Sequence, residues 1–226
     1  MQKRNSSGKE KAMYQYILFD LDGTLTDPGL GITNSVMYAL KKFNIEVEDR
    51  AELYKFIGPP LKESFEIFYG FSDEESDLAV AYYREYFKVT GLYENEVYAG
   101  IEEMLKELKA KNKTLVVATS KPEEFAVEIL KHFHLDHYFD FIAGATMDGS
   151  RSRKADVISY ALENCKIEDL SATIMVGDRE HDILGAKQVG LQSIGVLYGY
   201  GNYEEFKAAG AAYIAENTAD ILRIVC

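Results

Sequence analysis

The sequence predicts an α/β fold in which a doubly wound parallel sheet carries an inserted, all-helical segment. Three observations predict it. Short apolar runs that end in polar residues recur along the chain, as buried strands of a parallel sheet do. Amphipathic helical patterns lie between most of these runs, which is the order of a doubly wound sheet. After the first run, however, about 75 residues show helical periodicity without a convincing strand, which is too long for a simple connection.

Six segments are predicted to form the strands. The first, residues 16–19, is an apolar run followed by charged residues and Gly23, as expected of a buried strand that ends in a turn. Four similar runs and a weaker edge candidate follow, at 114–118, 139–143, 173–176, 193–197 and, for the edge, 212–215.

Helical patterns follow these strands. In the first of them Ile101, Met104, Leu105 and Leu108 lie on one face, which can therefore pack on a sheet. The predicted helices are 101–111, 125–133, 155–164 and 183–189. Ligands of such folds bind beyond the carboxyl ends of the strands, so the chemistry is expected there.

The long helical stretch is interpreted as a cap inserted into the core. Its four helical patterns, at 29–43, 53–56, 61–69 and 74–89, can bury a small core of their own. We predict a flexible tail at 1–13, a core domain at 14–26 and 97–226, and a cap domain at 27–96. The tail is basic and polar, offers Met13 as a candidate start, and lacks the apolar region of a secretory signal.

The composition predicts a folded protein with an acidic surface. Hydrophobic residues make up 47% and the formal net charge is −12, which argues against global disorder and against a nucleic acid polymer as partner. Cys165 and Cys226 show no metal-ligand spacing. Since no run approaches the roughly 20 apolar residues that cross a bilayer, we expect a cytoplasmic monomer or homodimer without membrane contact.

Two acids follow the first predicted strand. Asp20 and Asp22 are two residues apart, and on an extended segment such side chains point to the same side. Hydrolysis of a phosphate ester needs a nucleophile for phosphorus and a proton donor for the departing alkoxide. Asp20 can attack and Asp22 can donate, while Gly23 permits a sharp turn after them. An aspartate that only caps the next helix is the structural alternative.

The string DLDGTLTD, which begins at Asp20, resembles the first motif of the haloacid dehalogenase-like superfamily, and three further motifs occur in that family's order. The resemblance implies a Rossmann-like core, phosphatase activity, and Asp20 as a nucleophile that forms an aspartyl phosphate. The second motif is similar to Thr119-Ser120, which implies that Thr119, Ser120 and Gly23 bind the phosphate. Ser120 could instead, or in addition, cap the helix that follows.

Lys154 resembles the third motif of the family, a lysine near the start of a later helix. The resemblance implies an ammonium that offsets negative charge on Asp20 and on the phosphoryl oxygens. Arg151 and Arg153 are rivals for this role, although the spacing to the helix favours Lys154. His181 is close enough along the chain to reach the site, but a turn at the surface is the preferred interpretation.

The fourth motif, GDxxxD, is similar to the segment that contains Asp178 and Asp182. Four carboxylates at one sheet edge repel one another unless a hard cation is present. The resemblance therefore implies Mg²⁺, held by Asp20, by the main-chain carbonyl of Asp22 and by Asp178. Asp182 is expected to be a further ligand or to support Lys154.

The resemblance is closest to the phosphoglycolate phosphatase and 5′-nucleotidase subgroup, through the strings IGPPL and GSRSRK. It implies a magnesium-dependent phosphatase for a small phosphorylated metabolite such as phosphoglycolate. A 5′-nucleotidase or a sugar phosphomutase of the same superfamily is the alternative. An inactive regulatory or binding homologue is the alternative from another class. A receiver-like signalling domain is disfavoured, because it has no use for a helical cap.

Three residues of the cap are candidates for substrate specificity. Gly58, Pro59 and Lys62 stand where a cap helix is predicted to begin. A rigid turn there could present N–H groups and an ammonium to an anionic group of the substrate. A helix start that only packs the cap is the alternative.

Overall fold

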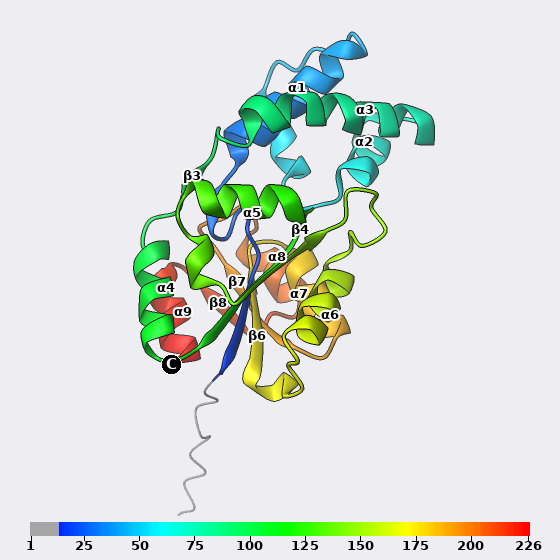
Figure 1. Cartoon of the computed structure of the whole chain (residues 1–226). Coiled ribbons are helices and arrows are strands. Elements are labelled where there is room, and N and C mark those ends of the chain that lie inside the picture. Colours follow the sequence, from blue (N-terminus) through cyan, green and yellow to red (C-terminus); the bar gives the residue numbers. More distant parts are fainter. Residues whose placement is uncertain (1–13) are drawn as a thin grey trace, which may run out of the picture.

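The structure is a computed structural model that describes residues 14–226, so the predicted tail lies outside the described residues. Its centre is a six-stranded parallel sheet in the order β5-β4-β1-β6-β7-β8 (Figure 1). The strands are β1 (Tyr16–Phe19), β4 (Thr114–Pro122), β5 (Phe141–Ala145), β6 (Thr173–Gly177), β7 (Gln192–Val196) and β8 (Tyr213–Ala215). The predicted doubly wound sheet is confirmed.

Strand β1 is buried on both faces. It pairs in parallel with β4 on one side and with β6 on the other. Ile17 and Phe19 belong to the hydrophobic cluster on one face of the sheet, whereas Leu18 belongs to the cluster on the other. Because helices cover both faces, the strand is apolar at every position instead of alternating.

Helices pack on the two faces of the sheet as a doubly wound fold requires. One face carries α4 (Ile101–Ala110), α5 (Glu123–His132) and α9 (Thr218–Val225), and the other carries α6 (Lys154–Asn164) and α7 (Glu180–Gln188). A further helix, α8 (Tyr203–Ala209), packs against α7. Within the described region, no helix has both the length and the apolar character needed to span a membrane.

Several core segments differ from the prediction, among them β4, which runs to Pro122, and α9, which was not predicted. β5 begins at Phe141, two residues later than expected, because its pairing sets Phe141 opposite Val116 of β4. The apolar run alone could not show at which residue the pairing with β4 begins. α8 was not predicted, since only Phe206 and Ala209 of this short, charged helix are buried.

A helical insert, residues 28–95, lies between β2 (Thr26–Asp27) and β3 (Glu96–Val97). It contains α1 (Gly29–Lys42), the 3₁₀ helix η1 (Arg50–Phe56), α2 (Leu61–Tyr69), α3 (Asp73–Tyr86) and the π-helix η2 (Phe87–Gly91). β2 and β3 form an antiparallel pair where the chain leaves and re-enters the core. This pair was not predicted, because a strand of two residues is too short to show an alternating hydrophobic pattern. The division into domains at 14–26, 97–226 and 27–96 stays a prediction.

Aromatic side chains fill the centre of the insert. The ring of Phe56 lies 5.1 Å from that of Phe65 and 5.3 Å from that of Phe68, between centroids. The same hydrophobic cluster continues through Leu21 and Leu25 into the sheet. The insert therefore shares one continuous apolar cluster with one face of the sheet.

Replacing Ile17 by Ala should lower the free energy of unfolding by about 2–5 kcal/mol, because a fully buried side chain is deleted and leaves a cavity. Urea denaturation measures the change. Ile67→Ala is the matched control, since Ile67 is 73% exposed, and it should change stability by less than about 0.5 kcal/mol. Equal losses in the two variants would contradict this assignment of the core.

Candidate functional site

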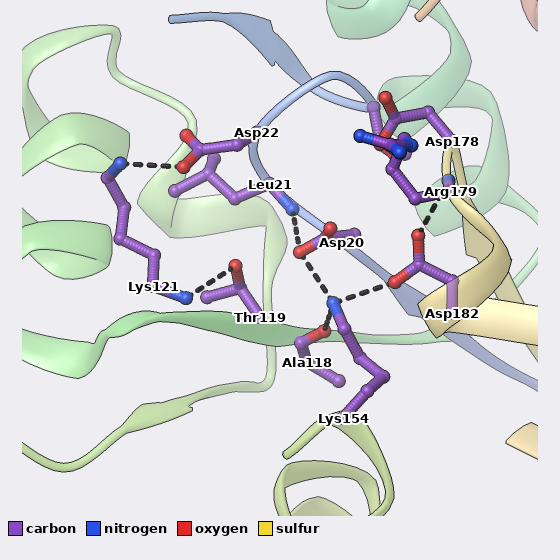
Figure 2. A network of polar contacts seen from close by, with 11 residues as sticks. Asp20, Leu21, Asp22, Ala118, Thr119, Lys121, Lys154, Asp178, Arg179 and Asp182 are labelled. Atoms are coloured by element: carbon purple, nitrogen blue, oxygen red, sulfur yellow. Dashed lines mark hydrogen bonds and ion pairs between the residues drawn. The ribbon is translucent and has the colours of Figure 1, made fainter. Parts of the chain in front are cut away.

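The candidate site lies at the carboxyl edge of the sheet, where three neighbouring strands end. Asp20 directly follows β1, Thr119 lies near the end of β4, and Asp178 directly follows β6. Because β1 pairs in parallel with both β4 and β6, these ends meet. Figure 2 shows their side chains gathered at this edge. The N–H of Asp20 donates to the carbonyl of Val176 at 2.9 Å, which fixes the end of β1 against the end of β6.

One buried lysine joins two of the acids. Lys154 Nζ lies 2.9 Å from Asp20 Oδ1 and 2.7 Å from Asp182 Oδ1, and it donates to the carbonyl of Ala118 at 3.1 Å (Figure 2). Lys154 is the first residue of α6, and the packing of α6 on β4 brings it to the sheet edge. Burial opposes its charge, but the carboxylates of Asp182 and Asp20 outweigh burial and raise the pKa of Lys154. The ammonium form is therefore retained.

Three carboxylates lie close together beside this lysine. Oxygen atoms of Asp20, Asp178 and Asp182 are all within 4.8 Å of one another, and the three residues are buried. Asp178 accepts hydrogen bonds from the N–H of Tyr200 at 2.8 Å and from Thr24 Oγ1 at 3.4 Å. Burial, followed by the charges of Asp182 and Asp20, raises the pKa of Asp178 well above its usual value. Burial likewise raises the pKa of Asp182.

Two glycines let the backbone approach Asp178. Gly23 has a φ of +79°, and a Cβ there would lie 2.1 Å from Asp178 Oδ2. A Cβ on Gly199 would lie 2.2 Å from the carbonyl oxygen of Gly23. This close packing brings Tyr200, which the sequence analysis did not place in the site, to Asp178. The N–H of Gly23 donates to the carbonyl of Thr26 at 2.8 Å, so in this structure it serves the turn.

The carboxylate cluster fits a magnesium ion. Asp20, Asp178 and Asp182 offer the oxygen ligands that Mg²⁺ prefers, in a buried cluster. Among residues 14–226, the four buried aspartates of this edge, Asp20, Asp22, Asp178 and Asp182, are accompanied by two buried ammonium groups, those of Lys154 and Lys121. The excess negative charge lies in a low dielectric, and burial, together with the neighbouring acids, raises the pKa values of three of these four aspartates, Asp22, Asp178 and Asp182. A divalent cation would offset that excess.

Asp22 lies apart from these three acids. Its carboxylate points away from Asp20 and toward Lys121, whose Nζ is 2.7 Å from Asp22 Oδ2 (Figure 2). The two-residue spacing predicted convergence with Asp20, but the strand ends at Phe19 and the chain then turns at Gly23. Burial raises the pKa of Asp22, although Lys121 lowers it. The metal role predicted for Asp22 involves its main-chain carbonyl and stays a prediction.

Thr119 and Ser120 lie where β4 loses its register with β5. Pairing is regular up to Ala118 and resumes at Pro122, so residues 119–121 leave the ladder. Thr119 is buried, and its Oγ1 accepts a hydrogen bond from the N–H of Lys121 at 3.2 Å. α5 begins without a side-chain cap, so the alternative role of Ser120 as a helix cap is wrong in this structure.

A cavity of about 500 Å³ lies between the insert and the sheet edge. It reaches the sheet edge at Asp22, Ser120 and Lys121. Its aromatic lining comprises Phe56, Tyr83, Phe87 and Phe125. The cavity therefore adjoins the predicted proton donor rather than the three-carboxylate cluster, and it offers room for the leaving part of a substrate.

The three cap residues singled out from the sequence all line this cavity. Gly58 and Pro59 lie in the turn before α2, and Lys62 lies in its first turn. Lys62 Nζ is 2.8 Å from Asp73 Oδ1 and 2.7 Å from Asp77 Oδ1. Its charge is thus already compensated by two carboxylates of α3.

The other cations considered for the site lie elsewhere. Arg151 pairs with Glu123 at 3.2 Å and donates to the carbonyl of Gly144 at 2.9 Å. Arg153 is exposed. Within residues 14–226, neither arginine pairs with an acid of the site. His181 is partly buried, and burial lowers its pKa.

Two arginines bond the insert to the core on either side of the cavity. Arg179, next to Asp178, donates to the carbonyl of Ile57 at 2.8 Å. Arg84 of α3 donates to the carbonyl of Met147, in the loop after β5, at 3.0 Å. The structure therefore has the insert seated against the sheet edge.

Comparison with known proteins agrees with this arrangement. A family model described as haloacid dehalogenase-like hydrolase matches residues 17–196. The chain is 46% identical over 214 residues to a 5′-nucleotidase of Pseudomonas aeruginosa, covering 94% of this chain and 96% of that protein. It is 30% identical over 217 residues to a phosphoglycolate phosphatase of Vibrio vulnificus, covering 92% and 95%.

A solved structure is similar over the whole fold. The crystal structure of a predicted phosphatase from Clostridium acetobutylicum has a TM-score of 0.91 and 53% sequence identity, and the match covers 93% of this chain and 97% of that one. Together with the family match, these similarities show that the chain belongs to the haloacid dehalogenase-like hydrolases and is a phosphatase of that family.

Proposed function

We propose that the protein is a magnesium-dependent phosphatase that hydrolyses a small phosphate monoester through an aspartyl phosphate on Asp20. The observation that best supports this is the set of contacts from Lys154 to Asp20 and Asp182, beside a third buried acid, Asp178. A buried ion pair that served stability alone would need no third carboxylate, since each added buried charge is unfavourable.

In the first half of the reaction, a carboxylate oxygen of Asp20 attacks phosphorus and the bond to the ester oxygen breaks. Asp22 gives its proton to that oxygen, and Lys154 offsets charge on the phosphoryl oxygens. Thr119 and Ser120 hold the phosphoryl group. The raised pKa of Asp22 suits the acid role, because the carboxyl group then keeps its proton to higher pH.

In the second half, Asp22 takes a proton from the water that attacks the aspartyl phosphate. Inorganic phosphate leaves and Asp20 is restored. Asp20, Asp178, the main-chain carbonyl of Asp22 and, as ligand or support, Asp182 would hold Mg²⁺. When bound, the ion supplies positive charge that stabilises the transferring phosphoryl group.

Two substrate classes have support. Phosphoglycolate is the candidate that the sequence motifs favour. A mononucleotide is the second candidate, because a cavity of about 500 Å³ with four aromatic side chains exceeds the needs of a two-carbon acid and suits a base. The relative from Pseudomonas aeruginosa is named for that activity. A sugar phosphomutase, or an inactive homologue, has no such supporting observation.

The setting of the enzyme is also proposed. We expect it to act in the cytoplasm on metabolites rather than on nucleic acid polymers, since the formal net charge of −12 repels polyanions. A monomer or a homodimer suits a site built within one chain. The helical insert would act as a cap domain that excludes water during the reaction.

Asp20→Asn should lower kcat for p-nitrophenyl phosphate by at least about 10³-fold while the protein stays folded, because the amide has the same shape but is a poor nucleophile. Steady-state kinetics and circular dichroism measure both effects. Mass spectrometry of acid-quenched wild type should detect one added phosphoryl group, absent in the variant. Normal turnover by Asp20→Asn would refute the covalent mechanism.

Mg²⁺ should raise the melting temperature of the wild type, because an ion that binds only the folded state stabilises it. Asp178→Asn should lose most of this gain, whereas Glu163→Gln, an exposed acid on α6, should keep it. Since burial raises the pKa of Asp178, protons compete with the metal at lower pH, and the gain should shrink as the pH falls. A gain independent of Asp178 would contradict the site. Full activity after exhaustive chelation would contradict the metal requirement.

Asp22→Asn should slow hydrolysis of an alkyl phosphate by about 10²–10⁴-fold, because the alkoxide then leaves without a proton. Its effect on p-nitrophenyl phosphate should be smaller, since p-nitrophenolate leaves without protonation. The measurement is kcat/KM for each ester. Equal losses on both, under conditions where chemistry limits the rate, would count against the acid role.

A further inference from the structure

Lys121 is a buried cation whose hydrogen-bonding capacity is only partly used. Within residues 14–226 the one acceptor of its ammonium is Asp22 Oδ2, at 2.7 Å. The side chain is 5% exposed, and Nζ lies 4.6 Å from the centre of the Phe87 ring, which the insert contributes. An ammonium has three N–H donors, and a buried charge with unpaired donors is unfavourable. The chain therefore leaves two donors for another molecule.

The surroundings of Lys121 indicate which molecule that is. Lys121, Asp22 and Phe87 all line the cavity between the insert and the sheet edge. If Asp22 protonates the ester oxygen, the ammonium bonded to Asp22 lies beside the leaving alcohol. An acceptor oxygen on that alcohol would meet the free donors without any change in the chain.

We propose that Lys121 determines specificity for the leaving alcohol. One of its N–H groups orients Asp22, and the others bind an oxygen that the alcohol carries close to its ester oxygen. This inference rests on the proposed role of Asp22 as the proton donor. The acceptor is a carboxylate in an ester of the phosphoglycolate type and a hydroxyl in an ester of a polyhydroxy alcohol such as a nucleoside.

Lys62, the cation suggested by the sequence, is less suited to this role. It is more exposed than Lys121, and its charge is compensated by Asp73 and Asp77. A screened, exposed ion pair contributes little to binding. The carboxylate that pairs with Lys121 is Asp22, which is also the proposed proton donor.

The experiment compares three small alkyl esters on the full chain: phosphoglycolate, 2-hydroxyethyl phosphate and n-propyl phosphate. The last has the size of the others but no acceptor beside the ester oxygen. Wild type should prefer the two oxygen-bearing esters in kcat/KM, by about 10-fold to 100-fold for the carboxylate and by less for the hydroxyl, as hydrogen bonds to a charged donor allow. Lys121→Met should reduce both preferences to about one.

Controls separate this role from others. Lys106→Met removes an exposed lysine on α4 and should keep the preferences. If Lys121→Met fails to fold, Lys121→Gln keeps an N–H donor for Asp22 without the charge, and it should lose the preference for the carboxylate. Activity of the wild type on p-nitrophenyl phosphate reports the phosphatase chemistry independently, so absence of that activity would refute the proposed function and not this inference alone.

Two results would overturn the inference. The first is a wild type that does not distinguish n-propyl phosphate from either oxygen-bearing ester. The second is a Lys121→Met variant that slows all three alkyl esters equally and keeps the wild-type preferences, because Lys121 would then act only through Asp22. A surviving preference for one ester identifies that ester's oxygen as bound by another residue.

Discussion

The bonds from Lys154 to Asp20 and Asp182 are the interaction on which the catalytic edge depends. A parallel sheet brings its strand ends together, so acids that follow β1 and β6 must share one small buried volume. Their mutual repulsion is severe in a low dielectric. Lys154 offsets part of it, while burial and the charge of neighbouring acids raise the pKa values of Asp178 and Asp182. A bound divalent cation would relieve this repulsion.

Close backbone packing is the second consequence of this arrangement. Asp178 must hold its position among like charges, and it does so through hydrogen bonds from Tyr200 and Thr24. These bonds require the loops after β1 and β7 to touch, which only Gly23 and Gly199 allow. The position of Asp178 among the acids therefore depends on the close packing of these two glycines.

Much of the fold and part of the site could be predicted from the sequence. Apolar runs such as 16–19 identified the strands because a strand buried on both faces has no polar position. Motif order brought Asp20, Lys154 and Asp182 together correctly. The direction of Asp22 was wrong, because strand spacing says nothing once the chain turns. Lys121 was missed because a single lysine just after the predicted strand 114–118 belongs to no periodic pattern and to no recognised motif. Its importance comes from its burial beneath the insert, which depends on the tertiary structure.

The structure divides the acids of this edge into two environments. Asp20 and Asp182 pair with Lys154 within the core, and Asp178 lies close to both of these acids. Asp22 faces the insert instead, and its surroundings combine Lys121 with the aromatic wall of the cavity. Under the proposed mechanism, proton transfer would take place where core and insert meet, whereas attack on phosphorus would take place in the core alone. A substrate that fills the cavity would then alter the environment of Asp22, which lines it, and would leave the surroundings of Asp20 unchanged. Variation in the insert can thus change which alcohols leave, while the chemistry at phosphorus stays the same.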